Sequence, residues 1–422
     1  MARYDIVVYG ATGFTGVVVA RMLASEPLFK GKTIAVAGRS EDKLQTVLED
    51  IARETGIQEV RKYPIIVADN SNEESLANMA KQAKVIINAV GPYLLYGEAV
   101  VRAAVNNGAS HVDLSAELAF LEGMEKKYGQ AAKEKGVHIV GACGFDAIPS
   151  DLGTEYLKQN FDGTLDYVET CVRLNRGPAG YSFNTATFDS LLEGIKSIRE
   201  GGQSAAVGDR SLMPKPMPQS NYGPPFRLPL SRMRNNVINA WTMPMPGADK
   251  PIIEKSQYHD YHVNGKRPVQ VYTYFTIGSF FESIALVMWV SIIGILGFFA
   301  PTRRFLAAHA EQISFGMFKK SGPSKEQIRE ATFDYFIFGT GWEKGQSTET
   351  KPTKTAAVLC HGPDPGYTGA TACVCASALA LLDDRDKLPK EGGVYTTATA
   401  FRNTRIFEYT RKMGVTFDMI PM

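Results

Sequence analysis

Short apolar runs alternate with amphipathic stretches over the first 150 residues. Apolar positions recur at helical spacing in residues 17–25, 41–55, 73–81, 98–107 and 116–135. Before, between and after these stretches lie six compact apolar runs, at residues 5–9, 33–37, 63–67, 85–89, 111–114 and 138–141. Strands that alternate with helices are typical of a parallel sheet covered on both faces. We therefore predict a doubly wound α/β domain over residues 1–150.

The pattern changes after residue 150. Aromatic-rich strand candidates at 167–174 and 269–277 stand among longer polar segments. They predict a second, α+β domain over residues 151–360 that binds substrate or mediates dimerisation. We expect residues 361–422 to return and pack on the first two domains.

A proline-rich stretch lies inside the second domain. Residues 208–251 hold nine of the 22 prolines, and residues 210–234 carry five basic residues and no acidic one. Proline removes a backbone donor and fixes φ, so this composition predicts a loop or lid. Two interpretations remain open: a solvated connection, or a role in covering the active site or touching an acidic surface.

An uncharged apolar segment occupies residues 283–302, followed by Arg303 and Arg304. Twenty such residues are long enough to cross a bilayer, and the arginine pair favours the cytoplasmic side. Crossing would separate the last third of the chain from the first domain, although the two should pack together. We therefore expect a shallow hairpin, broken near Gly294 and Gly297, that dips into a membrane leaflet or a lipid droplet. A buried core helix is the alternative.

The composition restricts the class of partner and the compartment. Forty-six Lys and Arg against 44 Asp and Glu give no reason to expect nucleic acid. The first residues lack a secretory pattern, and five scattered cysteines form neither a disulfide framework nor a zinc spacing. His259 and His262 have no evident third ligand, so we predict no metal. We expect an intracellular, membrane-associated protein on an organelle or a lipid droplet, with the mitochondrion as another possible location.

The first strand candidate runs directly into a glycine-rich turn, Gly-Ala-Thr-Gly-Phe-Thr-Gly at residues 10–16, and then into a helix. Such a turn lets the backbone approach a pyrophosphate, which the amides of the helix N-terminus stabilise. The spacing is GxxGxxG, which differs from GxGxxG by one position. Its place between the first strand and the first helix still predicts a Rossmann dinucleotide site, with a ligand-free tight turn as the alternative.

The end of the second strand candidate indicates which dinucleotide binds. It reads Val36-Ala-Gly-Arg-Ser40, without the carboxylate that would accept the ribose hydroxyl of NAD. Arg39 offers a planar cation and Ser40 a hydroxyl where the 2′-phosphate of NADP would lie. We predict NADP(H) in preference to NAD(H), although Glu41 and Asp42 keep NAD possible and Arg39 could simply be a surface residue.

The ends of the third and fourth strands complete the predicted cofactor site. Asp69 could meet the adenine amino group, and residues 89–91 would lie beside the nicotinamide ribose. The predicted cofactor-binding residues are Gly10, Ala11, Thr12, Gly13, Phe14, Thr15, Gly38, Arg39, Ser40, Asp69, Ala89, Val90 and Gly91.

Hydride transfer also needs a proton donor or an oxyanion partner near the substrate. None of the 18 tyrosines is followed by Lys four residues later, so the short-chain dehydrogenase mechanism is disfavoured. We predict Tyr93, Tyr96 and Asp146 as catalytic residues. Each has a simpler explanation as a packing or helix-capping residue. Three further polar residues lie near the same strand ends: Asp113, Ser115 and Glu117.

Several of these motifs together resemble the saccharopine dehydrogenase-like oxidoreductases. The resemblance implies a Rossmann domain, a second α/β domain before a C-terminal helical return, and a homodimer. It leaves the substrate open, because this branch also resembles bacterial trans-acting enoyl reductases of lipid synthesis. The matching segments, which span nearly the whole chain, are residues 9–16, 36–40, 90–93, 96–98, 113–117, 144–151, 362–367 and 392–395.

The combined expectation is an NADPH-dependent reductase of a small apolar substrate, a lipid enoyl or carbonyl compound, at a membrane or lipid-droplet surface. An enzyme for a small polar amino acid would not need the apolar segment. Two alternatives remain: a soluble amino-acid dehydrogenase, and a scaffold that binds NADP(H) without turnover.

Overall fold

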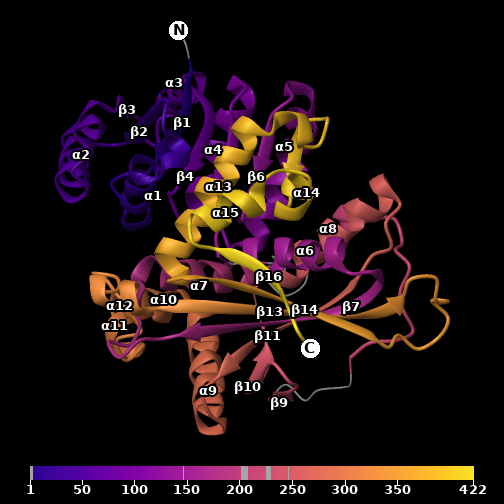
Figure 1. Ribbon diagram of the computed structural model, residues 1–422. Coiled ribbons are helices and arrows are strands. Elements are labelled where there is room, and N and C mark those ends of the chain that lie inside the picture. The colour runs from indigo at the N-terminus through magenta and orange to yellow at the C-terminus, as the bar shows by residue number, and fades with distance from the viewer. Residues whose placement is uncertain (1–2, 146, 201–207, 225–229, 246) are drawn as a thin grey trace. The chain divides into compact units, whose positions relative to one another are not determined.

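The computed structural model describes residues 3–145, 147–200, 208–224, 230–245 and 247–422 (Figure 1). The chain divides into two units. The first comprises Met1–Phe145 and Gly366–Val415, and the second comprises Asp146–Pro365 and Thr416–Met422. The C-terminal segment is therefore shared between the two units.

The first unit contains a seven-stranded sheet in the order β15-β6-β5-β4-β1-β2-β3, and every pairing in it is parallel. This arrangement confirms the predicted Rossmann fold and its six strands. The seventh strand, β15, comes from the C-terminal segment and was not predicted. The strands are β1 (Tyr4–Tyr9), β2 (Ile34–Gly38), β3 (Ile65–Val67), β4 (Ala83–Asn88), β5 (Ser110–Asp113), β6 (His138–Val140) and β15 (Gly393–Tyr395).

Local capping fixes the starts of two helices in this unit. The Ser40 side chain accepts a hydrogen bond from the first turn of α2, and Asn72 does the same for α3. The helices are α1 (Phe14–Ser25), α2 (Glu41–Thr55), α3 (Glu73–Lys81), α4 (Tyr93–Asn107), α5 (Leu118–Lys135), α13 (Ala370–Asp383), α14 (Thr397–Phe401) and α15 (Ile406–Lys412).

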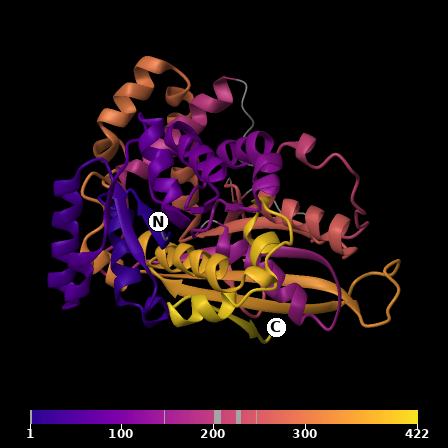
Figure 2. The ribbon, with the colours of Figure 1, turned by 90° about the horizontal axis from the view of Figure 1, so that it is seen from above.

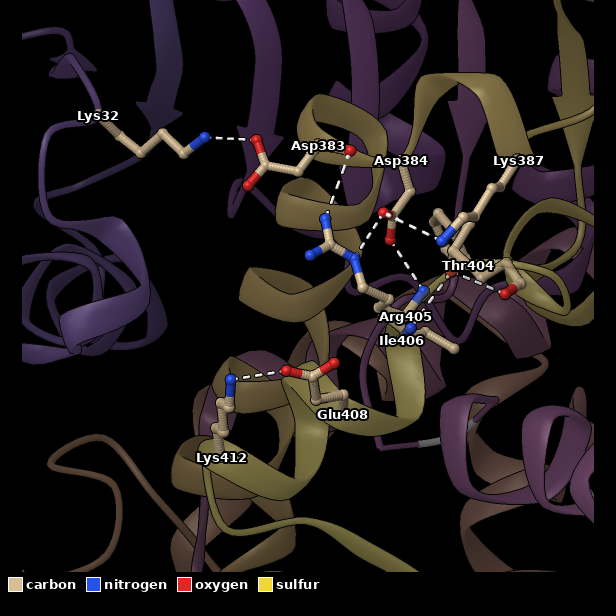
Figure 3. A network of polar contacts seen from close by, with 10 residues as sticks. Lys32, Asp383, Asp384, Lys387, Thr404, Arg405, Ile406, Glu408 and Lys412 are labelled. Carbon is tan, nitrogen blue, oxygen red and sulfur yellow. Dashed lines mark hydrogen bonds and ion pairs between the residues drawn. The ribbon is translucent and has the colours of Figure 1, made fainter.

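The C-terminal helices of this unit pack beside its N-terminal strands (Figure 2). Helix α13 contacts α1, β4 and β5, and its small side chains are buried. Ion pairs fix the end of the helix: Lys32 pairs with Asp383, and Arg405 Nε donates to Asp384 at 2.8 Å (Figure 3). This segment is therefore an integral part of the first unit.

The second unit contains a mixed seven-stranded sheet in the order β16-β14-β13-β7-β11-β10-β9. Strands β7 and β11 pair in parallel, and the other pairings are antiparallel. The predicted strands at 167–174 and 269–277 correspond to β7 and β11. The strands are β7 (Gly163–Asn175), β9 (Ser231–Arg234), β10 (Asn239–Pro244), β11 (Gln270–Ile277), β13 (Thr332–Glu343), β14 (Lys354–Pro363) and β16 (Thr416–Ile420). A separate short pair joins β8 (Phe183–Asn184) to β12 (Phe318–Lys319).

The loop prediction for the proline-rich stretch was partly wrong. Residues 231–244 form the antiparallel strands β9 and β10 at one edge of the sheet. Residues 231–243 contain no proline, and Pro244 is the last residue of β10. Strand pairing is therefore possible despite the high local proline content.

Helices of the second unit cover one face of its sheet and form a separate cluster at one end. Gly153 of α6 faces Ile337 of β13, where an added Cβ would come within 2.7 Å of the Ile337 side chain. The Tyr335 hydroxyl donates to Asp249 of α8 at 2.7 Å. The helices are α6 (Gly153–Asn160), α7 (Thr185–Arg199), α8 (Asp249–Asn264), α9 (Phe280–Gly297), α10 (Ala300–Ala308), α11 (Ala310–Ile313) and α12 (Lys325–Glu330).

The apolar segment forms α9 and the start of α10, with a break at Phe298 and Phe299. The predicted break near Gly297 is confirmed, whereas Gly294 lies within α9. Helix α9 packs along one edge on α7, its first turn contacts β10 through the rings of Phe280 and Trp241, and Figure 1 shows its far end pointing away from the sheet. The relation of this helix to a membrane is considered below as a proposal.

Candidate dinucleotide site

The candidate site lies where the strand order of the first sheet reverses, between β1 and β4. Open α/β sheets bind ligands beyond the carboxyl ends of their strands at such a switch point. The order β4-β1-β2-β3 aligns the four strand ends from which the cofactor residues were predicted. The sheet topology therefore brings these separate segments to one edge.

The loop after β1 requires glycine at two positions. Gly10 has φ of +85°, and a Cβ there would lie 2.5 Å from the Val90 side chain. A Cβ on Gly16 would lie 2.1 Å from the carbonyl oxygen of Gly10. The close approach of α1 to the loop thus depends on glycine at these two positions.

The N-terminal end of α1 suits an anion. Thr12 and Gly13 are exposed, Gly13 is the N-cap with no side-chain cap, and the first turn contains no acidic residue. The first amides of a helix carry partial positive charge and lack partners within the helix. These residues would hold the pyrophosphate of a dinucleotide, with Ala11 and Thr15 flanking the exposed turn.

Arg39 and Ser40 follow Gly38 at the end of β2, as the sequence indicated. Arg39 is exposed, and its charge helps to lower the pKa of Asp69 after the β3 strand. Hydrogen bonds from the Ser71 backbone and hydroxyl to Asp69 Oδ1 are the larger causes of that lowered pKa. Arg39 is thus available for a 2′-phosphate, while Asp69 also stabilises its own turn.

The segment after β4 lies against the phosphate loop. The Ala89 amide donates to the Tyr9 carbonyl at 2.9 Å, and Val90 is next to Gly10. Gly91 is exposed at the end of this segment. The structure therefore groups residues 89–91 with the glycine-rich turn, and their place beside the nicotinamide ribose stays a prediction.

An aromatic contact at this site was not predicted. The rings of Phe14 and Tyr367 have centroids 4.6 Å apart and meet edge to face at 64°. Phe14 belongs to the phosphate loop, whereas Tyr367 belongs to the C-terminal segment of the same unit. Residues 362–367 were recognisable as a motif, but local sequence offered no indication that Tyr367 would contact Phe14.

The predicted catalytic residue Tyr93 is buried and has a structural role. Its hydroxyl donates to the Asn88 carbonyl at 3.0 Å and accepts from the Leu114 amide at 3.3 Å. Burial, together with the nearby Asp113 carboxylate, raises its pKa well above the usual value. These contacts favour the packing explanation over proton donation.

Glu117 has an unexpected role at the start of α4. Its carboxylate accepts hydrogen bonds from the Tyr93 amide at 2.9 Å and the Leu94 amide at 2.7 Å. The helix consequently begins at Tyr93, five residues before its predicted start at residue 98. The capping side chain is remote in sequence, so no local signal marked this helix start.

The other candidates differ in accessibility. Tyr96 is exposed on α4 and remains the predicted proton donor of this unit. Asp113 is buried, and its Oδ1 accepts from the amides of Ser115 and Ala142, which holds the ends of β5 and β6 together. Asp146 lies outside the described residues.

Comparisons with known proteins agree with this geometry. Residues 6–140 match the family model described as the saccharopine dehydrogenase NADP binding domain. The chain is 36% identical to a human saccharopine dehydrogenase-like oxidoreductase, covering 99% of this chain and 97% of the relative. The chain belongs to the saccharopine dehydrogenase-like oxidoreductases. A relative from Caenorhabditis elegans named "Lipid droplet localized protein" is 45% identical, with 99% of each chain covered.

One solved structure shares the overall fold. The apo saccharopine dehydrogenase (L-Glu forming) of Saccharomyces cerevisiae has a TM-score of 0.53 and 13% identity, covering 99% of this chain and 100% of that one. This likeness confirms the predicted combination of a Rossmann unit and a second sheet domain. The family match and the named relatives establish an NADP(H)-binding oxidoreductase. NADP(H) would supply or accept the hydride, and the residues described above would hold it.

Proposed function

We propose that this saccharopine dehydrogenase-like protein uses NADPH to reduce an apolar lipid substrate, an enoyl or carbonyl compound, at a membrane or lipid-droplet surface. The observation that carries the lipid part is the outer face of α9. Its exposed residues include Phe281, at 80% exposure, and Ile295, at 65%. A surface helix of a water-soluble unit normally presents polar side chains to solvent, and α9 presents the reverse pattern.

Only one edge of α9 is buried in the protein. Ser283, Ile293 and Gly297 are its buried residues, and the Trp289 indole donates to the Ile313 carbonyl at 3.0 Å. This edge packs on α7, which carries charged residues such as Glu193 and Lys196. A helix crossing the bilayer with this packing would draw the charges of α7 into hydrocarbon. The arrangement therefore supports a helix lying in the lipid surface.

The lipid proposal can be tested by flotation with phospholipid vesicles and with triacylglycerol droplets. A Phe281→Ser, Met288→Ser and Ile295→Ser triple variant should reduce the bound fraction at least about tenfold, because it removes exposed apolar area. The matched control places serine at exposed apolar positions elsewhere: Val67, Val263 and Met419. Equal binding of the test variant and the wild type would refute the proposal, provided that both retain the same circular dichroism spectrum.

Cofactor selection is the second part of the proposal. We propose that Arg39 selects NADPH by pairing with the 2′-phosphate. Arg39→Ala should weaken NADPH binding about tenfold or more and leave NADH binding nearly unchanged, measured by nicotinamide fluorescence. Parallel losses for NADPH and NADH would show that Arg39 has no part in selection. NADPH oxidation with enoyl and carbonyl lipids then tests the reductase activity, and binding without turnover of either substrate class would favour the scaffold alternative.

A further inference from the structure

A polar cluster interrupts the apolar face of the second sheet. It comprises Arg173 and Asn175 on β7, Asp334 on β13 and His361 on β14. Arg173, Asp334 and His361 occupy directly opposed positions on three neighbouring strands. These strands lie inside the sheet order and away from its edges.

Part of the face that carries the cluster is apolar, although Glu169 of β7 and Asp418 of β16 share this face. Farther along the same strands it presents Cys171, Phe336, Phe338 and Ala357, all buried in one hydrophobic cluster. The Arg173 guanidinium carbon stands 5.0 Å from the centroid of the Phe336 ring. The polar group thus begins where the apolar surface ends, and Arg173 bridges the two.

Asp334 accepts hydrogen bonds from the other members of the cluster. Its Oδ2 accepts from Arg173 Nε at 3.2 Å, from Arg173 Nη2 at 2.5 Å and from Asn175 Nδ2 at 2.9 Å. Its Oδ1 lies 2.8 Å from His361 Nδ1. Burial alone would raise the pKa of Asp334, but hydrogen bonds from Asn175, Arg173 and His361 outweigh burial and keep this pKa below the usual value. The carboxylate is therefore ionised and saturated with donors.

The carboxylate of the cluster is nearly buried, whereas the side chains that donate to it are partly exposed. The Asp334 side chain is 10% exposed, whereas the side chains of Arg173 and His361 are 42% and 48% exposed. An ionised carboxylate only accepts hydrogen bonds, so the proton on the His361 ring that faces it belongs to Nδ1. His361 Nε2 and Arg173 Nη1 are the ring and guanidinium nitrogens that these bonds leave for other partners.

We infer that Arg173 and His361, held by Asp334, bind an anionic oxygen group, a carboxylate or a phosphate, on a ligand of the second unit. The Arg173 guanidinium offers a charged donor to such a group, and His361 Nε2 donates to it when the ring carries a proton on both nitrogens. Asp334 is the positioning residue, because its hydrogen bonds fix both side chains. The inference rests on the proposed function in one respect: the anionic group would be the polar end of the apolar substrate. The same chemistry would also accept the phosphate of a lipid headgroup.

The test uses the imidazole signal of His361 as a local probe. The chain contains six histidines, so histidine-labelled protein gives few side-chain signals, and loss of one in His361→Gln identifies the residue. Sodium hexanoate, inorganic phosphate and hexylamine are titrated separately at constant pH and ionic strength. We expect a saturable shift of the His361 signal with one or both anions and none with the amine. Hexanoate binding would assign the site to an acyl carboxylate, and binding of phosphate alone would assign it to a phosphate group.

Two variants distinguish specific binding of the anion by Arg173 from a general effect of removing one positive charge. Arg173→Gln should raise the dissociation constant of the bound anion about tenfold or more, as expected from losing a charge-assisted hydrogen bond. Arg405→Gln is the matched control, because Arg405 also pairs with a buried carboxylate, Asp384, but in the other unit. The absence of a saturable shift with either anion, or equal affinities in Arg173→Gln and wild type, would overturn the inference. NADPH binding and lipid flotation, measured on the same protein, show separately whether the proposed function has failed.

Discussion

Helices α9 and α13 are both apolar and of similar length, yet they occupy opposite environments. They lie in the two segments among the described residues that are long and apolar enough to cross a membrane. Only 17% of the apolar stretch that forms α9 is buried, whereas 83% of the apolar stretch that contains α13 is buried. Composition and length therefore do not decide whether such a helix belongs to a core or to a surface.

Side-chain size accounts for much of the difference. Helix α13 is built mainly from Ala, Cys, Thr and Ser, so α1, β4 and β5 can approach it closely. Helix α9 carries Phe, Ile, Val, Met and Trp around most of its circumference. Gly297 lets α9 approach Leu192 and Ile195 of α7. Small residues thus permit close contact on all sides of α13, whereas large side chains cover most of α9.

The largest expected effect comes from placing the same charge in each helix. Ala376→Asp in α13 should cost about 4 kcal/mol or more, because an unpaired carboxylate would enter a fully buried site. Val290→Asp on the exposed face of α9 should change the free energy of unfolding by less than about 0.5 kcal/mol. Urea denaturation followed by circular dichroism measures both. A comparable loss in Val290→Asp would mean that protein contacts bury this face of α9.

The pH dependence of the free energy of unfolding tests whether the core beside α13 excludes water. Strand β5, which α13 contacts, carries His111 and Asp113. Burial lowers the pKa of His111 to about 3 and raises that of Asp113 to about 7. Folded Asp113 binds a proton more tightly than the unfolded chain, so its contribution to stability falls as the pH rises from about 4 to about 7. Folded His111 binds a proton less tightly, so its contribution rises between about pH 3 and pH 6.5.

His111 and Asp113 change the free energy of unfolding in opposite directions as the pH rises. Removing the Asp113 contribution should therefore reveal the His111 contribution. Asp113→Asn keeps the carbonyl oxygen that accepts from Ser115 and Ala142. In this variant only His111 of the pair still contributes to the pH dependence of stability. Between pH 4.5 and 6.5 the free energy of unfolding of this variant should rise by about 2 kcal/mol more than that of the wild type. Urea titrations at several pH values measure the difference. Exposed Asp386→Asn is the control, and parallel profiles for Asp113→Asn and wild type would contradict the expectation.

The smallest expected effect concerns the helix starts. The Ser279 side chain caps α9 by accepting from the Glu282 amide at 3.2 Å, whereas α13 has no side-chain cap at Gly369. A helix with little burial depends more on its cap. Ser279→Ala should therefore cost about 1 kcal/mol locally, seen as faster hydrogen exchange in the first turn of α9. Ser279→Asp, which can also cap, should retain the protection. Unchanged exchange in Ser279→Ala would show that packing on α7 alone fixes this end.

The sequence by itself predicted the elements of residues 1–150 because their signals are local. Apolar periodicity marked the six strands, the residue order of the turn at 10–16 marked the phosphate loop, and Arg39 indicated NADP(H). The apolar segment and its break near Gly297 were also visible, since length, charge and glycine can be read directly along the chain. The long strands β13 and β14 were not predicted, because their partners are distant in sequence and pairing defines them.

Only the tertiary structure decided which distant residues meet. Glu117, which follows β5, accepts a hydrogen bond from the first amide of α4. Tyr367 of the C-terminal segment contacts Phe14, and β15 extends the first sheet. Cross-strand register brought Arg173 to Asp334 and His361, which lie more than 150 residues farther along the chain. Burial separated α9 from α13, which length and overall hydropathy could not do. Each of these outcomes depends on contacts between segments remote in sequence, and such contacts leave no mark in the local pattern of side chains.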